Sequence, residues 1–350
     1  MRKKINVLVA DDSALMRKYI REMLESDPEI KVIAVARDGE DTIEKARKYN
    51  PDVITLDINM PKMDGITALQ ILVGEKIAPI IMLSSLTQEG ALITFEALEL
   101  GAFDYVAKPG GTVSLNIKQV KDELIAKVKA AALSRTMGKL IRKREKIKVK
   151  KRKPKRISKR KAVAIGISTG GPKTLMDVIP YLPENIPADI YIVQHMPPSF
   201  TKSFAQRLDK NSKITVVEAE AGIEARNGLA VLGKGGYHLT VFQKMNGNII
   251  VRTPSLPRTM FMPSVNVMME SVLKVYGKDT VGVLMTGMGD DGADAMVKIR
   301  RAGGITVAES EETAIVFGMP REAIERGGAD YVEPSYKMAE KIVEAVYEEL

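Results

Sequence analysis

The stretch Ile5-Asn6-Val7-Leu8-Val9-Ala10-Asp11-Asp12-Ser13 is a short apolar run, rich in Val and Ile, that ends in two acids and a serine. Such a run is typical of a buried strand in a parallel sheet. Similar runs, separated by stretches of helical period, follow at residues 31–36, 53–56, 79–83 and 105–107. This βα repeat predicts an α/β domain with a doubly wound parallel sheet.

Polar side chains stand at the carboxyl ends of these predicted strands, where an open α/β sheet gathers its chemistry. They are Asp11, Asp12, Asp57, Ser84 and Lys108. Crowded carboxylates repel one another unless a cation compensates, and Mg²⁺ prefers oxygen ligands and suits sites that hold phosphate. A carboxylate held there can attack a phosphoryl donor and become an aspartyl phosphate. The alternative is that these acids only cap helices that follow the strands.

Three motifs make this segment resemble the response-regulator receiver domain, which is flavodoxin-like: Val9-Ala10-Asp11-Asp12-Ser13, Leu56-Asp57-Ile58-Asn59-Met60-Pro61-Lys62-Met63-Asp64-Gly65 and Gly101-Ala102-Phe103-Asp104-Tyr105-Val106-Ala107-Lys108-Pro109. The resemblance implies that Asp57 accepts the phosphoryl group. It implies that Mg²⁺ is held by Asp12, Asp57 and the carbonyl of Asn59, with Asp11 assisting. It also implies that Ser84 and Lys108 contact phosphoryl oxygens and that Tyr105 repacks as a switch.

The net charge of the 350-residue chain is +9, and one segment accounts for it. Between Lys139 and Lys161 there are 15 Lys or Arg residues and one acid, a net +14, so the remaining 327 residues carry −5. We interpret this run as a solvated linker, with contact to nucleic acid or an acidic partner as the alternative.

The composition excludes several other classes of protein. The chain has no cysteine, which excludes disulfides, thiolate metal sites and a cysteine nucleophile. No apolar run reaches the roughly 18 residues that a membrane span needs, and the first residues lack a signal-peptide core. We therefore expect a cytoplasmic protein without membrane insertion.

A second βα pattern begins at residues 162–165 and leads into Gly166-Ile167-Ser168-Thr169-Gly170. This segment matches G-x-S-x-G, in which small neighbours let a serine occupy a sharp strand-to-helix turn with its hydroxyl exposed. The N-terminus of the following helix offers N–H groups for a developing oxyanion. The alternative is that the glycine-rich turn cradles a phosphate.

A nucleophilic serine needs a base, and the chain has two histidines, His195 and His238. His195 follows the strand-like residues 189–194, whereas His238 stands in a turn entering another strand, where a structural role is the commoner one. The base needs an acid to fix its tautomer. Asp290 and Asp291 follow a buried run at residues 281–285, and the sequence alone leaves open whether either does more than cap a helix.

Residues from about 161 to the end resemble the catalytic domain of chemotaxis protein-glutamate methylesterases, through Gly166-Ile167-Ser168-Thr169-Gly170-Gly171-Pro172, Gln194-His195-Met196-Pro197, Gly235-Gly236-Tyr237-His238-Leu239 and Thr286-Gly287-Met288-Gly289-Asp290-Asp291-Gly292. The resemblance implies a triad of Ser168 as nucleophile, His195 as general base and Asp291 as orienter. Oxyanion candidates are the backbone N–H groups of the Ser168 turn, represented by Thr169, and of Met288. No cofactor is expected at the esterase site.

Together the two resemblances predict two doubly wound parallel-sheet domains: a receiver at residues 1–120 and a Rossmann-like, three-layer esterase domain at residues 161–350. A basic helical or flexible linker is expected between them at residues 121–160. The implied function is phosphorylation-activated removal of glutamyl methyl esters from bacterial chemoreceptors, with deamidation of receptor glutamines. The implied partners are methylated chemoreceptors and the chemotaxis histidine kinase, and no nucleic acid is expected.

One position departs from the family pattern, because Asn266 stands where the segment usually reads P-S-V-D. As a hypothesis for control, the unphosphorylated receiver covers the active-site mouth and phosphorylation shifts the population toward an open arrangement. Two rival functions remain. One is a transcription regulator that binds duplex DNA through the basic linker. The other is a small-molecule esterase that uses Ser168 with His238.

Overall fold

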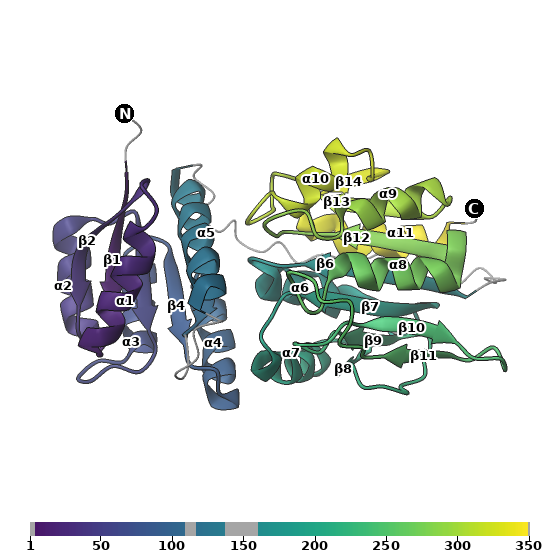
Figure 1. The fold of residues 1–350 in the computed structure, drawn as a ribbon, viewed down its shortest axis with the longest axis horizontal. Coiled ribbons are helices and arrows are strands. Elements are labelled where there is room, and N and C mark those ends of the chain that lie inside the picture. The colour runs from purple at the N-terminus through teal and green to yellow at the C-terminus, as the bar shows by residue number, and fades with distance from the viewer. Residues whose placement is uncertain (1–3, 109–116, 137–159, 349–350) are drawn as a thin grey trace. The chain divides into compact units, whose positions relative to one another are not determined.

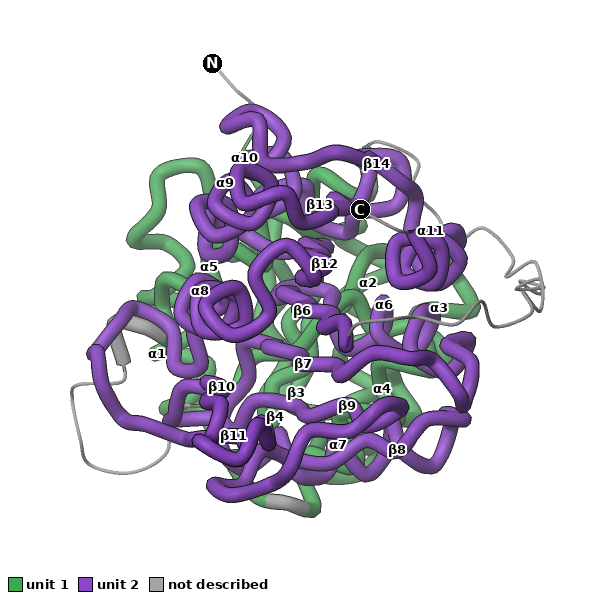
Figure 2. The backbone as a smooth tube through the Cα atoms, turned by 90° about the vertical axis from the view of Figure 1, so that its right-hand side faces the viewer, with its two compact units in different colours: residues 1–144 green, residues 145–350 purple. Residues whose placement is uncertain are grey.

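The structure is a computed structural model that describes residues 4–108, 117–136 and 160–348 (Figure 1). The chain divides into two compact units, Met1–Arg144 and Glu145–Leu350, which Figure 2 colours green and purple. The expected basic linker falls mainly on residues 137–159, which lie outside the described residues. Among the residues that the structure describes, no helix is both long and apolar enough to cross a membrane.

The first unit is built on a five-stranded parallel sheet in the order β2-β1-β3-β4-β5. The strands are β1 (Ile5–Ala10), β2 (Ile30–Ala36), β3 (Val53–Asp57), β4 (Ile80–Ser84) and β5 (Asp104–Ala107). All five predicted strands are present, with ends displaced by one residue or none. Strands β3 and β4 are buried along their whole length, which explains why their sequences are continuous apolar runs.

Helices cover both faces of this sheet, with α1 next to α5 on one face and α2, α3 and α4 in sequence on the other. Their bounds are α1 (Ala14–Glu25), α2 (Gly39–Tyr49), α3 (Gly65–Gly74), α4 (Gln88–Leu100) and α5 (Ile117–Thr136). The boundary expected at residue 120 falls inside α5. This helix buries Leu124, Val128 and Ala131 in the core of the first unit, so it is part of that unit.

The second unit contains a seven-stranded parallel sheet in the order β14-β13-β12-β6-β7-β9-β8. The strands are β6 (Lys161–Ile167), β7 (Ala188–Gln194), β8 (Thr215–Glu218), β9 (Leu229–Leu232), β12 (Thr280–Leu284), β13 (Ile305–Glu309) and β14 (Tyr331–Glu333). A separate antiparallel hairpin is formed by β10 (Thr240–Gln243) and β11 (Ile249–Arg252). The central strand β6 therefore lies between β12 and β7.

Helices on both faces complete the expected three layers. Their bounds are α6 (Gly171–Val178), α7 (Pro198–Asn211), α8 (Val265–Tyr276), α9 (Ala293–Arg301), α10 (Met319–Glu325) and α11 (Ser335–Tyr347), with short 3₁₀ turns at Ile179–Tyr181 and Gly277–Asp279. Figure 2 shows α8 and α9 on one side of the central strands and α6 and α11 on the other. At the start of β6, the Nζ of Lys161 donates to the carbonyl of Ala345 near the end of α11, at 3.2 Å.

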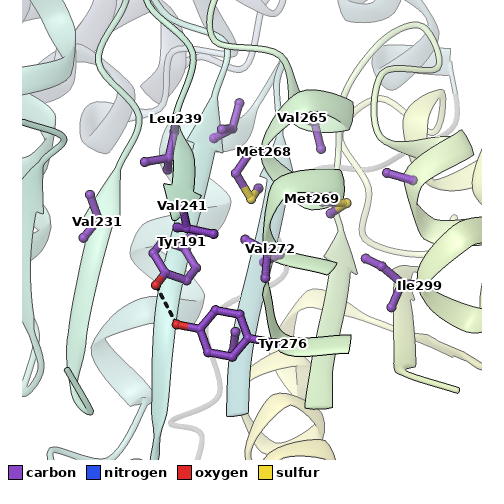
Figure 3. Packing of buried hydrophobic residues seen from close by; sticks show 14 of the residues in the cluster. Tyr191, Val231, Leu239, Val241, Val265, Met268, Met269, Val272, Tyr276 and Ile299 are labelled. Carbon is purple, nitrogen blue, oxygen red and sulfur yellow. Dashed lines mark hydrogen bonds between the residues drawn. The ribbon is translucent and has the colours of Figure 1, made fainter. Parts of the chain in front are cut away.

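The core between α8 and the sheet contains a polar network as well as apolar side chains (Figure 3). The Tyr191 and Tyr276 hydroxyls lie 2.8 Å apart, and Tyr276 donates to the buried carboxylate of Asp189 at 2.6 Å. The guanidinium of Arg160 pairs with the same carboxylate. Burial raises the pKa of both tyrosines, so they remain protonated donors. The network satisfies polar groups inside the core and fixes α8 against β7.

Candidate active site

Three loops that follow adjacent strands bring a hydroxyl, an imidazole and a carboxylate together. Ser168 follows β6, His195 follows β7 and Asp291 follows β12. The Oγ of Ser168 lies 3.1 Å from Nδ1 of His195, and Nε2 of His195 lies 2.9 Å from Oδ2 of Asp291. Because the carboxylate accepts from Nε2–H, Nδ1 keeps its lone pair and accepts from the serine hydroxyl. This is the arrangement of a serine nucleophile, a base and an orienting acid.

The nucleophile turn, residues 167–171, is held by backbone bonds and needs small neighbours. The N–H of Ser168 donates to the carbonyl of Thr286 at 2.9 Å, which ties this turn to the loop after β12. Gly170 has φ +75°, a left-handed conformation that favours glycine. A Cβ on Gly287 would lie 2.8 Å from the Cβ of Ser168, so this loop passes close to the nucleophile only because residue 287 is glycine.

The carboxylate of Asp291 lies at the N-terminus of α8 and is saturated with donors. Besides His195, it accepts from the N–H of Val265 at 2.7 Å, the hydroxyl of Ser264 at 2.8 Å and the N–H of Asn266 at 3.0 Å. Burial opposes its ionisation, but the hydrogen bonds and the charge of its partners outweigh burial and lower its pKa. The group is therefore a fixed anion behind the imidazole.

The neighbouring Asp290 is directed elsewhere. Its carboxylate forms an exposed ion pair with Arg326 at 2.7 Å, and that guanidinium also binds Asp294. Of the two acids that the sequence could not separate, the structure brings Asp291 to His195 and leaves Asp290 at the surface.

His238 is completely buried and does not approach the serine. Its Nε2 lies 2.6 Å from the carbonyl of Pro257, and its Nδ1 accepts from the N–H of Ser264 at 3.2 Å. With both ring nitrogens bonded to backbone, the imidazole supports the loop that delivers Ser264 to Asp291. This agrees with the structural role that the sequence favoured for this histidine.

Asn266, which stands where the family segment usually has an aspartate, has a structural role at the start of α9. Helix α9 begins at Ala293, and the preceding residue, Gly292, has no side chain to cap it. The Oδ1 of Asn266 accepts from the N–H of Ala295 at 3.0 Å and supplies that cap from another part of the chain. An amide oxygen serves this purpose as a carboxylate oxygen would.

The structure adds residues that sequence reasoning did not identify. The ring of Phe261 stacks on His195, with centroids 4.1 Å apart and planes 9° apart. The amide of Gln194 donates to the carbonyls of Ser168 and His195. The buried carboxylate of Glu309 accepts from the N–H of Thr286 at 2.8 Å. Only Gln194 carried a sequence signal, because it directly precedes His195.

Of the two oxyanion candidates, Thr169 lies in the nucleophile turn and Met288 in the loop after β12. The N–H of Ser168 already donates to the carbonyl of Thr286, so it is not available to a developing oxyanion. Thr169 is buried and its carbonyl accepts from the Thr286 hydroxyl at 2.9 Å. Met288 is 39% exposed and follows Gly287, the residue packed against Ser168.

In the first unit, an acidic cluster lies at the carboxyl ends of β1 and β3. Oxygen atoms of Asp11, Asp12 and Asp57 lie within 4.8 Å of one another. The Nζ of Lys108 lies 2.8 Å from Asp11 and 2.7 Å from Asp57. Three acids facing one ammonium leave an excess of negative charge on hard oxygen ligands, which suits a divalent cation such as Mg²⁺.

Opposing effects act on the pKa of Asp57. Burial raises its pKa and so does the neighbouring Asp11, while Lys108 and the N–H of Asn59 lower it, and the net direction is upward. The same carboxylates raise the pKa of Lys108 against the effect of its burial. A cation bound here would relieve the repulsion between the acids.

The other residues that the resemblance implied lie on strands of the same sheet or just beyond them. Ser84 ends β4 and its buried hydroxyl lies 2.7 Å from that of Thr94 on α4. Tyr105 lies on β5 with its ring buried, and the Nζ of Lys127 binds its carbonyl at 2.6 Å. Asn59 is exposed just beyond Asp57.

Comparison with known proteins assigns each half of the chain. Residues 7–118 match the family model for the response regulator receiver domain, and residues 163–342 match that for CheB methylesterase. A protein-glutamate methylesterase/protein-glutamine glutaminase of Syntrophomonas wolfei subsp. wolfei is 56% identical over 350 residues, covering 98% of this chain and 99% of that protein. A protein of the same name from Pyrococcus abyssi is 47% identical, covering 98% and 94%.

Among solved structures, the catalytic domain of Thermotoga maritima CheB methylesterase is 44% identical. It covers 53% of this chain and 97% of that chain, with a TM-score of 0.51. The matched regions include every motif on which the sequence resemblance rested. The chain therefore belongs to the CheB methylesterase family, with a response-regulator receiver domain preceding the methylesterase domain.

Proposed function

We propose that this chain is a phosphorylation-controlled serine hydrolase that removes glutamyl methyl esters from chemoreceptors, releasing methanol, and deamidates receptor glutamines. The observation that carries the proposal is the contact of Ser168, His195 and Asp291 at 3.1 and 2.9 Å, from loops 27 and 96 residues apart along the chain. Relatives that match nearly the whole chain are named for both activities.

The geometry supports acyl transfer through a covalent intermediate. Ser168 Oγ attacks the γ-carbonyl carbon of the methylated glutamyl side chain while its proton passes to Nδ1 of His195. The bond to the methoxy group then breaks, and the same proton leaves with methanol. Water attacks the acyl-enzyme, gives a proton to Nδ1, and releases the glutamate as Ser168 is reprotonated. With a glutamine substrate, ammonia replaces methanol as the leaving group.

Asp291 and the surrounding backbone stabilise the charges that this cycle creates. The carboxylate accepts from Nε2 throughout, so it keeps the imidazole oriented and stabilises the imidazolium. The developing oxyanion is assigned to the N–H group of Thr169, in the nucleophile turn, and to that of Met288, in the neighbouring loop after β12. Such donors contribute most where they are fixed before the reaction begins.

Control is assigned to the first unit. Asp57 takes the phosphoryl group of a phosphodonor, with a bond formed from its carboxylate oxygen to phosphorus as the leaving group departs. Asp12, Asp57 and the Asn59 carbonyl would hold Mg²⁺, which when bound supplies positive charge beside the phosphoryl oxygens. Lys108 and Ser84 are assigned to the same oxygens, and Tyr105 to the switch. The chemotaxis histidine kinase is the proposed donor.

The test is methanol release from methylated receptor, with and without a small phosphodonor. Ser168→Ala and His195→Ala are each expected to lower turnover on the order of 10⁴-fold, without additivity. His238→Ala separates the rival that uses His238 as the base, because it should destabilise the Ser264 loop without matching the kinetic loss of His195→Ala. A His195 variant with near-normal turnover would reject the proposed triad.

A further inference from the structure

The amide of Gln194 lies between the nucleophile turn and the base. Gln194 is the last residue of β7 and is 2% exposed. Its Nε2 donates to the carbonyl of Ser168 at 2.9 Å and to the carbonyl of His195 at 2.9 Å. Both hydrogens of the NH₂ group are therefore used, one on each proposed catalytic residue.

The orientation of this amide is determined by its surroundings. If it were reversed, Oε1 would face two carbonyl oxygens, and the resulting repulsion excludes that arrangement. In the orientation observed, Oε1 is buried and has no hydrogen-bond partner among the described residues.

Gly171, the first residue of α6, makes room for this amide. A Cβ at that position would lie 1.9 Å from Oε1 of Gln194. The N–H of Gly171 itself donates to the carbonyl of Ser168 at 2.8 Å, so the carbonyl that Gln194 binds is also part of the turn. The position of the Gln194 side chain is thus set by the same backbone that shapes the nucleophile turn.

We propose that Gln194 is a positioning residue that holds the Ser168 turn and the His195 loop at a fixed separation. This inference rests on the triad proposed above. Without the bridge, the two carbonyls lose their shared donor and the turns move independently, which lengthens the path from Oγ to Nδ1. Misplacement of reacting groups by about 1 Å costs on the order of 10²-fold in rate.

The first test is Gln194→Met, which keeps the length of the side chain and removes both donors. We expect kcat for methanol release to fall roughly 10- to 100-fold while KM changes less than about twofold. The rate at which a small aryl phosphonate labels Ser168 should fall by the same factor, because labelling requires the activated hydroxyl but not the receptor. Gln206→Met, on the exposed face of α7, is the matched control and should leave both rates unchanged.

Gly171→Ala reaches the same amide from the other side. The added methyl displaces Oε1, and alanine is compatible with the backbone because Gly171 does not have a positive φ. The methyl also comes within 2.9 Å of Cγ1 of Ile167. We expect a similar loss of kcat and labelling, and in combination with Gln194→Met a loss smaller than the product of the two single losses, because part of each acts through the Gln194 amide. This variant also provides the answer if Gln194→Met does not fold.

Wild-type kcat and labelling in folded Gln194→Met would overturn the positioning role, as would a loss confined to KM or additive losses in the double variant. Ser168→Ala measured in parallel separates this failure from failure of the triad. If Ser168→Ala abolishes both signals, the triad stands and only the role of Gln194 is in question. If Ser168→Ala keeps both signals, the triad itself is wrong.

Discussion

Replacement of Asp291 by asparagine tests the electrostatic part of the site. Each oxygen of this carboxylate accepts from one backbone N–H, Val265 on one side and Asn266 on the other. An asparagine NH₂ must therefore face one of them. The Ser264 hydroxyl and the Asn266 N–H both contact the same carboxylate oxygen, and the hydroxyl can rotate to accept a hydrogen bond from an asparagine NH₂ placed there. We therefore expect the asparagine oxygen to face His195, so that the imidazole keeps its tautomer.

If the tautomer is preserved, the expected loss of kcat in Asp291→Asn comes from removing the negative charge beside the imidazolium. A unit charge about 4 Å from the imidazolium contributes about 4 kcal/mol at an effective dielectric constant of about 20. Its removal should lower kcat about 10³-fold. This is less than the roughly 10⁴-fold loss expected where an asparagine forces the wrong tautomer. The kcat of Asp291→Asn is measured as methanol release from methylated receptor.

Stability should change as well, with a defined pH dependence. Losing the hydrogen bond that the Asn266 N–H donates to a charged group costs about 1.5–3 kcal/mol at neutral pH. Because the pKa of Asp291 is lowered by folding, its ionised form stabilises the fold above the unfolded value of about 3.9. That stabilisation is lost as the pH falls through the folded pKa. The difference between wild type and Asp291→Asn in urea unfolding should therefore shrink below about pH 4.

Asp290→Asn is the control, because it makes the same chemical change one residue away, at an exposed ion pair. Its kcat should stay within about twofold of wild type, since exposed pairs contribute little. An Asp291→Asn variant within tenfold of wild-type kcat would refute the electrostatic reasoning, and so would an equal loss at Asp290.

Three further predictions address other parts of the molecule. Phe261→Leu removes the ring that stacks on His195, and this aromatic contact contributes about 0.5–1.5 kcal/mol, so kcat should fall roughly 2- to 10-fold. Phe242→Leu, on the exposed hairpin, is the control and should leave kcat unchanged. Equal rates in the two variants would contradict this prediction. Asp57→Asn should abolish incorporation of labelled phosphoryl group, and chelation of divalent cations should do the same in wild type; label retained in either case would argue against the assigned acceptor and metal site. Deleting residues 1–144, the whole first unit including α5, should raise basal methanol release if the unphosphorylated receiver inhibits the esterase, and a folded truncation with unchanged or lower activity would speak against inhibition.

The central strands of the two main sheets could be predicted because they are buried on both faces. Continuous apolar runs such as 53–56 and 162–165 cannot be accommodated elsewhere in an α/β fold, and each is a strand. The domain boundary was harder to place. Helix α5 has an apolar face that matches the first sheet, and which sheet a helix packs on depends on contacts distant in sequence.

In the candidate site, too, some residues could be located from local sequence and others depend on contacts distant in sequence. Ser168 and His195 follow strands in motifs, so local pattern locates them. The choice between Asp290 and Asp291 depends on the N-terminus of α8, about 25 residues earlier in the chain, which only the folded structure brings to one of the two carboxylates. Phe261 has no sequence signal at all, because nothing local indicates that its ring faces an imidazole.

The contact between Lys161 and the last turn of α11 has a consequence for engineering. It means that the two ends of the esterase unit meet, so the unit can be treated as a closed module. A short peptide joining residues 160 and 348, with new termini opened at the fully exposed Met245 of the β10–β11 turn, should give a circular permutant that keeps its active site. The same property makes the module suitable for insertion into a loop of an unrelated sensor protein.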